Sequence, residues 1–270
     1  MATSAVELSS GEFEQIRRLA RERFGLDLRP GKESLVAARL GKRVREQRFS
    51  SFRDYFRHVL DDRTGEALTG MIDALVTNYT SFFREPAHFE FLRALAQDWQ
   101  PRRARVWCAA CATGEEAYSL AFVLAGGAFE LLATDISTRA LQAARRGVYG
   151  ADRLAEVPEP LRHRFFVRCS GPDQGQYQVR PEIRAQVDFR RINLIESFES
   201  LGGMTVIFCR NVMIYFDKAT QQDLVERLAQ RLEPGGYLFV GHSESLTGVR
   251  HGLEYVRPAV YRKRGGRCAM

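Results

Sequence analysis

Residues able to do chemistry gather where a strand-like run gives way to a helix-like run in the middle of the chain. The run Arg105–Ala110 is apolar enough for a buried strand, and it leads into a loop of small side chains that ends at Gly114. Two acids, Glu115 and Glu116, then begin an apolar helix-like run. Alanine, threonine and glycine let a ligand approach the backbone closely, so the pattern predicts a ligand site in this loop.

The kind of ligand follows from what this loop lacks. The three-glycine pattern that holds a pyrophosphate is missing, because only Gly114 is present. Two carboxylates at a helix start would repel a phosphate, whereas they favour a ligand with an ammonium group and ribose hydroxyls. S-adenosylmethionine (SAM) carries both groups and no phosphate. A tight strand-to-helix turn without a ligand explains the loop equally well at this point.

Asp135 is a second candidate for the same ligand. It follows the strand-like run Glu130–Thr134 and stands 21 residues after Gly114. An acid at this place accepts the ribose hydroxyls in dinucleotide folds, and the geometry serves any adenosyl ligand. Asp135 can instead cap the helix that begins near Ser137, and the two roles are compatible.

The segment Asn78–Glu85 is polar and aromatic, and it joins the two parts of the chain. An interdomain linker is one interpretation. Phe82 and Phe83 would be unusual in a solvated linker, so we expect the segment to be packed. Packing would direct the side chains of Asn78, Thr80 and Arg84 toward one place.

Another polar segment, Cys209–Phe216, follows the strand-like run at 205–209. Ligands in open α/β sheets bind at the carboxyl ends of strands, so Arg210, Asn211 and Tyr215 are placed to reach a ligand or substrate. Core packing with a satisfied hydroxyl is the alternative for Tyr215.

The elements that position these residues fall into two parts. Helical periodicity predicts a helical N-terminal domain over residues 1–76, followed by a linker over 77–90 that contributes to the ligand site. The remaining residues, 91–270, predict an α/β domain. A Gly/Pro turn between short strand-like runs at 164–180 predicts a small antiparallel β-subdomain inserted at about 160–186.

Strand-like and helix-like runs alternate in the second part. The expected strands are 105–110, 130–134, 187–192, 205–209, 237–241 and a terminal hairpin over 253–262. A helix over 219–232 is expected to end at Pro234-Gly235-Gly236. Such alternation implies a mostly parallel sheet with helices on both faces.

Composition narrows the class of protein. The chain has 270 residues, 45% of them hydrophobic, and no run reaches the roughly 18 apolar residues that a membrane span needs. The first ten residues lack the features of a signal peptide, so a cytoplasmic location is expected. The net charge of +7 suggests acidic partners, including nucleic acid. However, 36 of the 40 basic residues are arginines spread along the whole chain, which indicates a compositional bias.

Cysteine and histidine spacing gives no metal or redox signal. Cys108 and Cys111 form a CxxC pair, but no second pair follows at zinc spacing, and both flank small residues of an expected strand. We therefore interpret them as packing residues. The five histidines lack a metal-ligand spacing, so no metal site is expected.

Five segments, in order, resemble the CheR-type chemotaxis receptor methyltransferases over nearly the whole chain. They are Thr77–Glu85 (TNYTSFFRE), Val106–Ser119 (VWCAACATGEEAYS), Ala133–Asp135 (ATD), Ile207–Asp217 (IFCRNVMIYFD) and Gly241–Glu244 (GHSE). The resemblance implies transfer of a methyl group from SAM to glutamate side chains of chemoreceptors, which tunes receptor adaptation and leaves S-adenosylhomocysteine. It also implies a Rossmann-like SAM-dependent methyltransferase fold with a helical N-terminal domain and an inserted β-subdomain.

The resemblance also implies roles for single residues. Arg84 and Tyr215 would sit beside the reactive methyl group as the catalytic residues. The residues implied at the cofactor are Asn78, Thr80, Arg84, Glu116, Asp135, Asn193, Leu194, Arg210 and Asn211. Glu116 would hold the methionine end and Asp135 the ribose. The family often has serine or alanine at the positions of Cys108 and Cys111, and a smaller side chain at Tyr79.

Partners follow from the same resemblance. Receptor methylation regions are acidic helices, and the expected second helix carries Arg39, Lys42, Arg43 and Arg45 beside its apolar stripe. These four are the candidates for substrate docking, with a merely solvated face as the alternative. The hairpin at 164–180 resembles the β-subdomain that binds a C-terminal receptor peptide in some relatives. A methyltransferase acting on nucleic acid is the alternative function, although the chain lacks the Pro-Pro-Tyr and Pro-Cys signatures of such enzymes.

Overall fold

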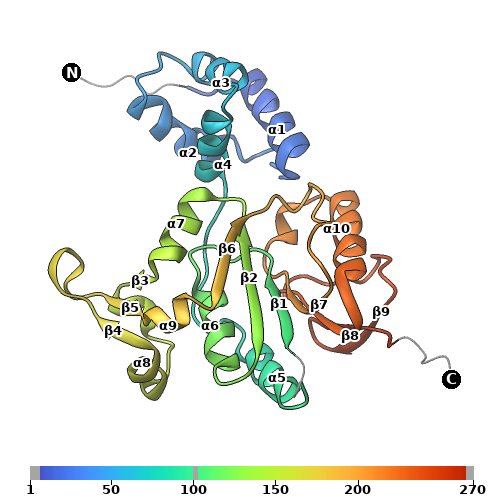
Figure 1. Cartoon of the computed structure of the whole chain (residues 1–270). Helices are drawn as coiled ribbons and strands as arrows, with labels where there is room; N and C mark the ends of the chain where they lie inside the picture. The colour runs from blue at the N-terminus through green and yellow to red at the C-terminus, as the bar shows by residue number, and fades with distance from the viewer. Residues whose placement is uncertain (1–6, 100–102, 266–270) are drawn as a thin grey trace. The chain divides into compact units, whose positions relative to one another are not determined.

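The computed structural model describes residues 7–99 and 103–265, and the chain divides into two compact units. The helical unit comprises the residues up to Thr77 together with Tyr215–Asp217. The sheet unit comprises Asn78–Ile214 and the residues from Lys218 onward (Figure 1). The short segment Tyr215–Asp217 therefore belongs, by its contacts, to the unit that precedes it in the chain.

Four amphipathic helices build the helical unit. They are α1 (Ser10–Phe24), α2 (Glu33–Glu46), α3 (Phe52–Asp61) and α4 (Glu66–Leu75). A capping box begins α1, where the Ser9 hydroxyl accepts from the Glu12 backbone N–H and the Glu12 carboxylate accepts from the Ser9 backbone N–H. Apolar side chains at helical spacing, among them Phe13 and Leu40, form a core of this unit's own.

A seven-stranded sheet forms the centre of the sheet unit. Its order is β6-β2-β1-β7-β8-β10-β9. The first five strands in this order pair parallel with their neighbours. β10 pairs antiparallel with both β8 and β9. The strands are β1 (Ala104–Cys108), β2 (Phe129–Asp135), β6 (Val187–Arg191), β7 (Met204–Phe208), β8 (Leu232–Phe239), β9 (Leu253–Arg257) and β10 (Val260–Lys263). The main helices are α5 (Pro86–Gln97), α6 (Glu115–Leu124), α7 (Thr138–Arg146) and α10 (Lys218–Arg231). The expected mostly parallel sheet is confirmed, and the carboxyl ends of its parallel strands share one edge.

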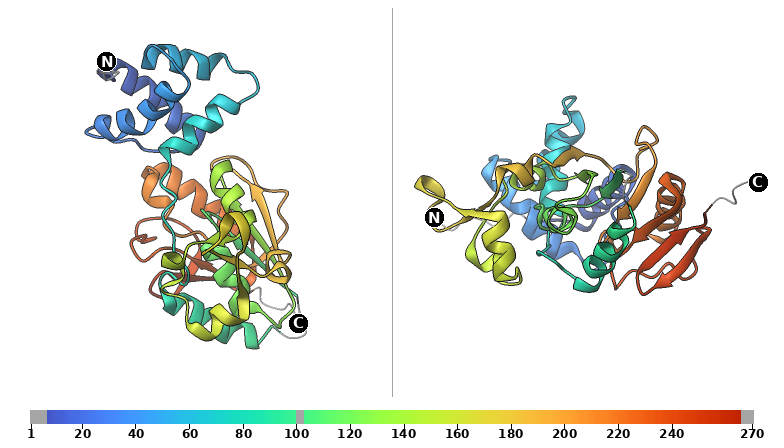
Figure 2. Two further views of the ribbon diagram at one scale, coloured as in Figure 1. Left: turned by 90° about the vertical axis from the view of Figure 1, so that its left-hand side faces the viewer. Right: turned by 60° about the horizontal axis from the view of Figure 1, so that its bottom comes forward.

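A second, three-stranded antiparallel sheet confirms the inserted β-subdomain. Its order is β3-β5-β4, with β3 (Val148–Tyr149), β4 (Phe166–Arg168) and β5 (Tyr177–Val179). The short helices α8 (Glu159–Phe165) and α9 (Pro181–Arg184) flank the hairpin β4–β5. The insertion and the terminal hairpin β9–β10 lie at opposite ends of the sheet unit (Figures 1 and 2). Sequence analysis missed β3, because two residues carry no readable alternation.

The strand after α10 differs from the expectation. Pro234-Gly235-Gly236 was expected to separate the helix from a strand beginning at Tyr237, but β8 begins directly after α10, at Leu232. Met204 pairs with Leu232 while Val206 pairs with Tyr237, so the extra residues form a bulge within the strand. A Cβ on Gly236 would lie 3.0 Å from the Thr205 carbonyl oxygen, which explains why glycine stands at this close approach.

Four of the five cysteines lie among the described residues, and all four are free. Cys108 and Cys111 are fully buried. Burial raises the pKa of both thiols well above the ordinary value, so the interpretation as packing residues is confirmed.

None of the helices described is at once long enough and apolar enough to cross a bilayer.

Candidate cofactor site

The loop between β1 and α6 is built so tightly that its last residue must be glycine. Gly114 has a backbone φ of 99°, which residues with a side chain rarely adopt. A Cβ there would lie 2.9 Å from the Ala144 Cβ and 3.0 Å from the Tyr149 hydroxyl. Ala112 also has a positive φ, of 46°. The loop is therefore a fixed, sharply turned backbone surface at the carboxyl end of β1.

Asp135 fastens this loop to the end of β2. Its carboxylate accepts the backbone N–H of Ala112 at 2.8 Å and that of Ser137 at 2.9 Å. Ser137, not Asp135, caps α7, because its hydroxyl accepts the Ala140 N–H at 3.1 Å. The Asn78 amide reaches the same hydroxyl at 3.3 Å. The structure thus brings together two residues predicted for the site, Asn78 and Asp135.

The two acids at the start of α6 are both paired with arginines. Sequence analysis treated them as bare negative charges, and this part of the reasoning was wrong. Glu115 forms an ion pair with Arg153 and accepts the Thr113 hydroxyl at 2.6 Å. Arg153 also donates to the carbonyl of Thr80 at 3.0 Å, so it links α6 to the Asn78–Glu85 segment.

Glu116 pairs with Arg210, which is the hub of a buried network. Arg210 Nη1 lies 2.6 Å from Glu116 Oε2, and Nη2 lies 2.8 Å from Glu85 Oε2. Nη2 also donates to the carbonyl of Arg84 at 2.7 Å. The side chain of Arg210 is 0% exposed. Burial opposes its charge, but Glu116 and Glu85 outweigh burial and raise its pKa.

Arg210 and Arg84, both predicted at the cofactor, differ in how far protein groups bind their guanidinium groups. Both Nη atoms of Arg210 are hydrogen-bonded to protein groups. The Cys108 thiol donates to the other carboxylate oxygen of Glu116, Oε1, at 3.4 Å. Arg84 is freer. Its guanidinium lies 5.6 Å from the centre of the exposed Tyr79 ring and 3.4 Å from the Tyr79 carbonyl. Among the described residues, no carboxylate lies within ion-pair distance of Arg84.

Three more predicted residues follow the carboxyl ends of β6 and β7. Asn193 is buried and its amide donates to Glu196 at 3.0 Å. The carbonyl of Leu194 accepts from Arg227 at 2.7 Å. Asn211 adopts φ 57°, beside Arg210. They stand at the same edge of the sheet as Asp135, since all these strands are parallel.

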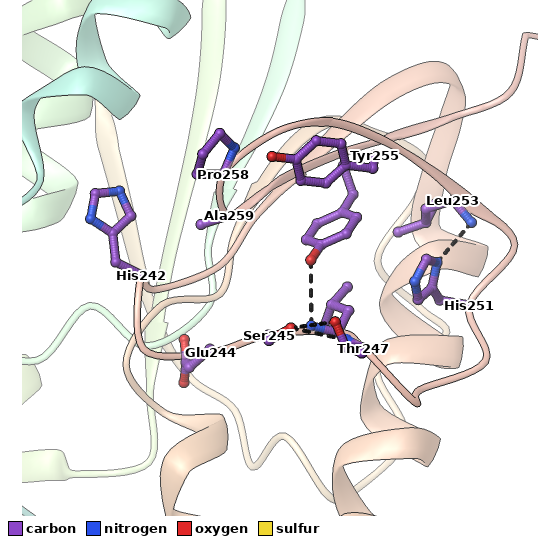
Figure 3. A pocket seen from close by; sticks show the side chains of 11 residues that line it. His242, Glu244, Ser245, Thr247, His251, Leu253, Tyr255, Pro258 and Ala259 are labelled. Atoms are coloured by element: carbon purple, nitrogen blue, oxygen red, sulfur yellow. Dashed lines mark hydrogen bonds between the residues drawn. The ribbon is translucent and has the colours of Figure 1, made fainter.

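Glu244 is a residue of this edge to which sequence analysis assigned no role. Its carboxylate accepts backbone N–H groups of Asn211 at 2.6 Å, Met213 at 2.7 Å and Gly241 at 2.7 Å. Burial raises the pKa of Glu244 against the effect of these hydrogen bonds. The acid of the GHSE segment thus holds the backbone that follows β7. Beyond it, a pocket of about 470 Å³ lies between this segment and the hairpin β9–β10 (Figure 3).

Tyr215, the second predicted catalytic residue, is half-buried and belongs to the helical unit. Its carbonyl accepts the Asp27 N–H at 2.8 Å, and the neighbouring Phe216 forms a bridge with Leu26. Its position beside the methyl group stays a prediction.

The four basic residues of α2 differ in their availability. Arg39 donates to the Thr77 hydroxyl at 2.7 Å and to the Leu75 carbonyl. Arg43 lies against Gly70 of α4, where a Cβ would meet its guanidinium. Both side chains are thus half-buried within the helical unit, whereas Lys42 and Arg45 are exposed. The exposed pair is the better candidate for docking.

A mostly parallel sheet with a close-packed loop after β1 and an acid at the end of β2 is a Rossmann-like arrangement that suits an adenosyl ligand, and the family match below makes it a SAM-dependent methyltransferase fold. Comparisons with known proteins agree. Residues 78–261 match the family described as CheR methyltransferase, SAM binding domain, and residues 11–76 match CheR methyltransferase, all-alpha domain.

Curated relatives cover nearly the whole chain. Chemotaxis protein methyltransferase 2 of Pseudomonas aeruginosa is 45% identical over 259 residues, which is 93% of this chain and 92% of that protein. The chemotaxis protein methyltransferase of Escherichia coli is 38% identical over 269 residues, or 96% of this chain and 93% of that protein. The Salmonella typhimurium protein of the same name is 38% identical over 254 residues, or 92% and 88%. The chain belongs to the CheR methyltransferase family.

Proposed function

We propose that this protein transfers a methyl group from SAM to glutamate side chains of chemoreceptors and thereby tunes receptor adaptation. The observation that carries the proposal is the family match, which extends over both units of the chain. The names of the relatives, chemotaxis protein methyltransferases, give the receptor pathway as the setting. Glutamyl methyl esters and S-adenosylhomocysteine would be the products.

The donor chemistry of the candidate site fits SAM. Asp135 offers a carboxylate for ribose hydroxyls at the end of β2, and the loop before Gly114 offers a close backbone surface. Glu115 and Glu116, each held by an arginine, stand at the start of α6 beside this loop. Further contacts are assigned to Asn78, Thr80, Asn193, Leu194 and Asn211.

Arg210 is given an indirect role in this proposal. Its guanidinium holds Glu116, Glu85 and the backbone of Arg84. Glu116 would then face the methionine end of SAM from a fixed position. Binding residues that are held in place lower the ordering cost of binding the cofactor.

The chemistry needs alignment more than proton transfer. SAM supplies an electrophilic methyl group on a sulfonium. A glutamate carboxylate, with an ordinary pKa of about 4.3, is already ionised at neutral pH and needs no general base. The protein therefore has to align the carboxylate oxygen with the methyl carbon and exclude water.

Arg84 is the proposed residue for this alignment. An arginine can hold a carboxylate through two parallel N–H groups, and Arg84 has no carboxylate partner within the described residues. Tyr215 stays the second residue proposed for catalysis. Arg84→Lys should lower kcat strongly, while the affinity for S-adenosylhomocysteine (AdoHcy) should fall less. Lysine keeps the positive charge but loses the two parallel N–H groups that bind a carboxylate. Normal turnover in both Arg84→Lys and Arg84→Ala would remove the role.

Receptor binding is assigned to two surfaces. The exposed Lys42 and Arg45 of α2 would attract the acidic methylation helices of a receptor. The hairpin β4–β5 would receive a C-terminal receptor peptide by adding it as a strand. Calorimetry with the cognate peptide tests the second surface. The receptor helices to be methylated are cytoplasmic, so this is the proposed place of action.

A methylation assay separates the proposal from methylation of nucleic acid. The protein is incubated with labelled SAM and either a receptor cytoplasmic fragment or RNA and DNA. Carboxyl methyl esters release methanol in base, whereas N-methyl products do not. Base-labile label on the receptor fragment is expected. Label on nucleic acid alone would overturn the proposal.

A further inference from the structure

Two distant segments of the sheet unit bring three possible metal ligands together. Glu85 and His88 lie at the start of α5, and His242 lies in the loop after β8. Glu85 Oε2 is 3.5 Å from His88 Nδ1 and 3.8 Å from His242 Nε2. All three ligand atoms lie within 4.8 Å of one another. No spacing in the sequence reveals this group, because His242 follows His88 by 154 positions.

His88 is an independent sign of a ligand at this place. Its side chain is 2% exposed, and neither ring nitrogen has a well-formed hydrogen bond within the described residues. Buried polar groups without partners are uncommon and costly. The backbone carbonyl of Pro258 lies within hydrogen-bonding reach of the His88 ring. Such a carbonyl is the usual outer partner that orients a metal-binding imidazole.

We propose that Glu85, His88 and His242 bind a Zn²⁺ ion, with a fourth position open to water. In a tetrahedral zinc site, bonds of about 2.0–2.1 Å place ligand atoms about 3.4 Å apart. The distances of 3.5 and 3.8 Å from Glu85 Oε2 need only small shifts to reach this value. Two imidazoles and one carboxylate form a set that zinc commonly takes.

The charges around the group permit a dication. Arg210 opposes it, because its guanidinium lies 2.8 Å from the same Glu85 oxygen. Glu116 binds the other side of that guanidinium at 2.6 Å, so the two carboxylates and one arginine carry a net charge of −1 before an ion binds. A carboxylate oxygen has lone pairs for both a guanidinium and a metal.

His242 connects the proposed metal site to solvent. Its side chain is 51% exposed and stands at the rim of the 470 Å³ pocket, with its ring turned away from Tyr255 (Figure 3). Its backbone N–H already donates to Glu85 at 3.2 Å. An ion here would fasten the start of α5 to the loop after β8. The imidazole nitrogens select zinc over Mg²⁺, which prefers oxygen ligands.

The test measures metal binding directly and does not depend on methyltransferase activity. Untagged full-length protein is freed of metal with EDTA, dialysed, and titrated with ZnCl₂ or MgCl₂ by calorimetry. One Zn²⁺ and no Mg²⁺ should bind. His242→Asn should weaken Zn²⁺ binding by more than the roughly 10–100-fold that losing an outer partner costs. The matched control is His251→Asn, a histidine that lines the same pocket outside the ligand group.

Two further measurements keep the result decisive. His88→Asn, checked for folding by circular dichroism, should also weaken binding. Co²⁺ in place of Zn²⁺ should give a spectrum without thiolate charge-transfer bands, which separates this site from the cysteines. Equal Zn²⁺ affinity in the wild type and in His242→Asn, no binding at all, or thiolate bands would each overturn the proposal.

Discussion

Replacing Arg210 by methionine should destabilise the sheet unit strongly. The change removes a fully buried guanidinium that holds Glu116 at 2.6 Å and Glu85 at 2.8 Å. Those side chains are only 8% and 14% exposed, so water can solvate them poorly. Removing one partner of a buried ion pair typically costs about 3–5 kcal/mol, because the other charge stays uncompensated. We expect a loss in this range at pH 7.

Two further variants locate the origin of this loss. Arg210→Lys keeps the charge, but its single nitrogen cannot take the positions of both Nη1 beside Glu116 and Nη2 beside Glu85, so an intermediate loss is expected. The double variant Arg210→Met, Glu116→Gln should recover part of the stability, because it removes one of the two uncompensated charges. Non-additivity of this kind is the signature of a coupled pair.

Urea denaturation followed by tryptophan fluorescence is the assay. Both tryptophans of the chain, Trp99 and Trp107, lie in the sheet unit, so the signal reports on that unit alone. AdoHcy affinity is measured on the same samples by calorimetry. A loss below about 1 kcal/mol, the range of exposed ion pairs, combined with abolished AdoHcy binding would refute the reasoning. Arg210 would then act on the cofactor directly.

Three other predictions concern the loop, the buried histidine and the basic helix. Gly114→Ala should cost more stability than Gly126→Ala, since both have φ near 100° but only Gly114 has atoms within 3.0 Å of an added Cβ; equal losses in urea titrations would contradict this. Burial, the largest cause, lowers the pKa of His88 from 6.5 to about 4. The unfolded chain therefore binds the extra proton first, and the free energy of unfolding in EDTA should fall by up to about 3 kcal/mol as pH drops from 6.5 to 4; His88→Gln should flatten that curve, and an unchanged slope would count against it. Lys42→Glu with Arg45→Glu should slow receptor methylation and weaken its salt dependence, and a wild-type salt profile would exclude docking at this face.

The sequence was most informative where local patterns decide the structure. Helical periodicity predicted the N-terminal helices, and the alternation of strand-like with helix-like runs predicted the mostly parallel sheet, because propensity and burial agree there. Asp135 could be placed at the end of β2 because a strand, a polar end and a capped helix follow one another directly. The bulge in β8 could not be predicted, since Pro234 and Gly235 are typical of a turn and only the pairing with β7 shows otherwise.

Contacts between distant segments were beyond prediction from single residues. The arginine partners of Glu115 and Glu116 come from 38 and 94 positions further along the chain. No local pattern states that Arg39 turns to the end of α4 while Lys42 stays exposed. These pairings form only when the whole chain has folded, so no short stretch of the amino-acid sequence predicts them.

Site-resolved mass spectrometry of a methylated receptor tests the central claim most directly. A receptor cytoplasmic fragment is incubated with the protein and with SAM that carries a deuterated methyl group, then digested and sequenced. Our account predicts the heavy methyl on glutamate side chains, with its loss after base treatment. Label that is absent from the fragment, or that stays on lysine, arginine or a chain terminus after base, would contradict it.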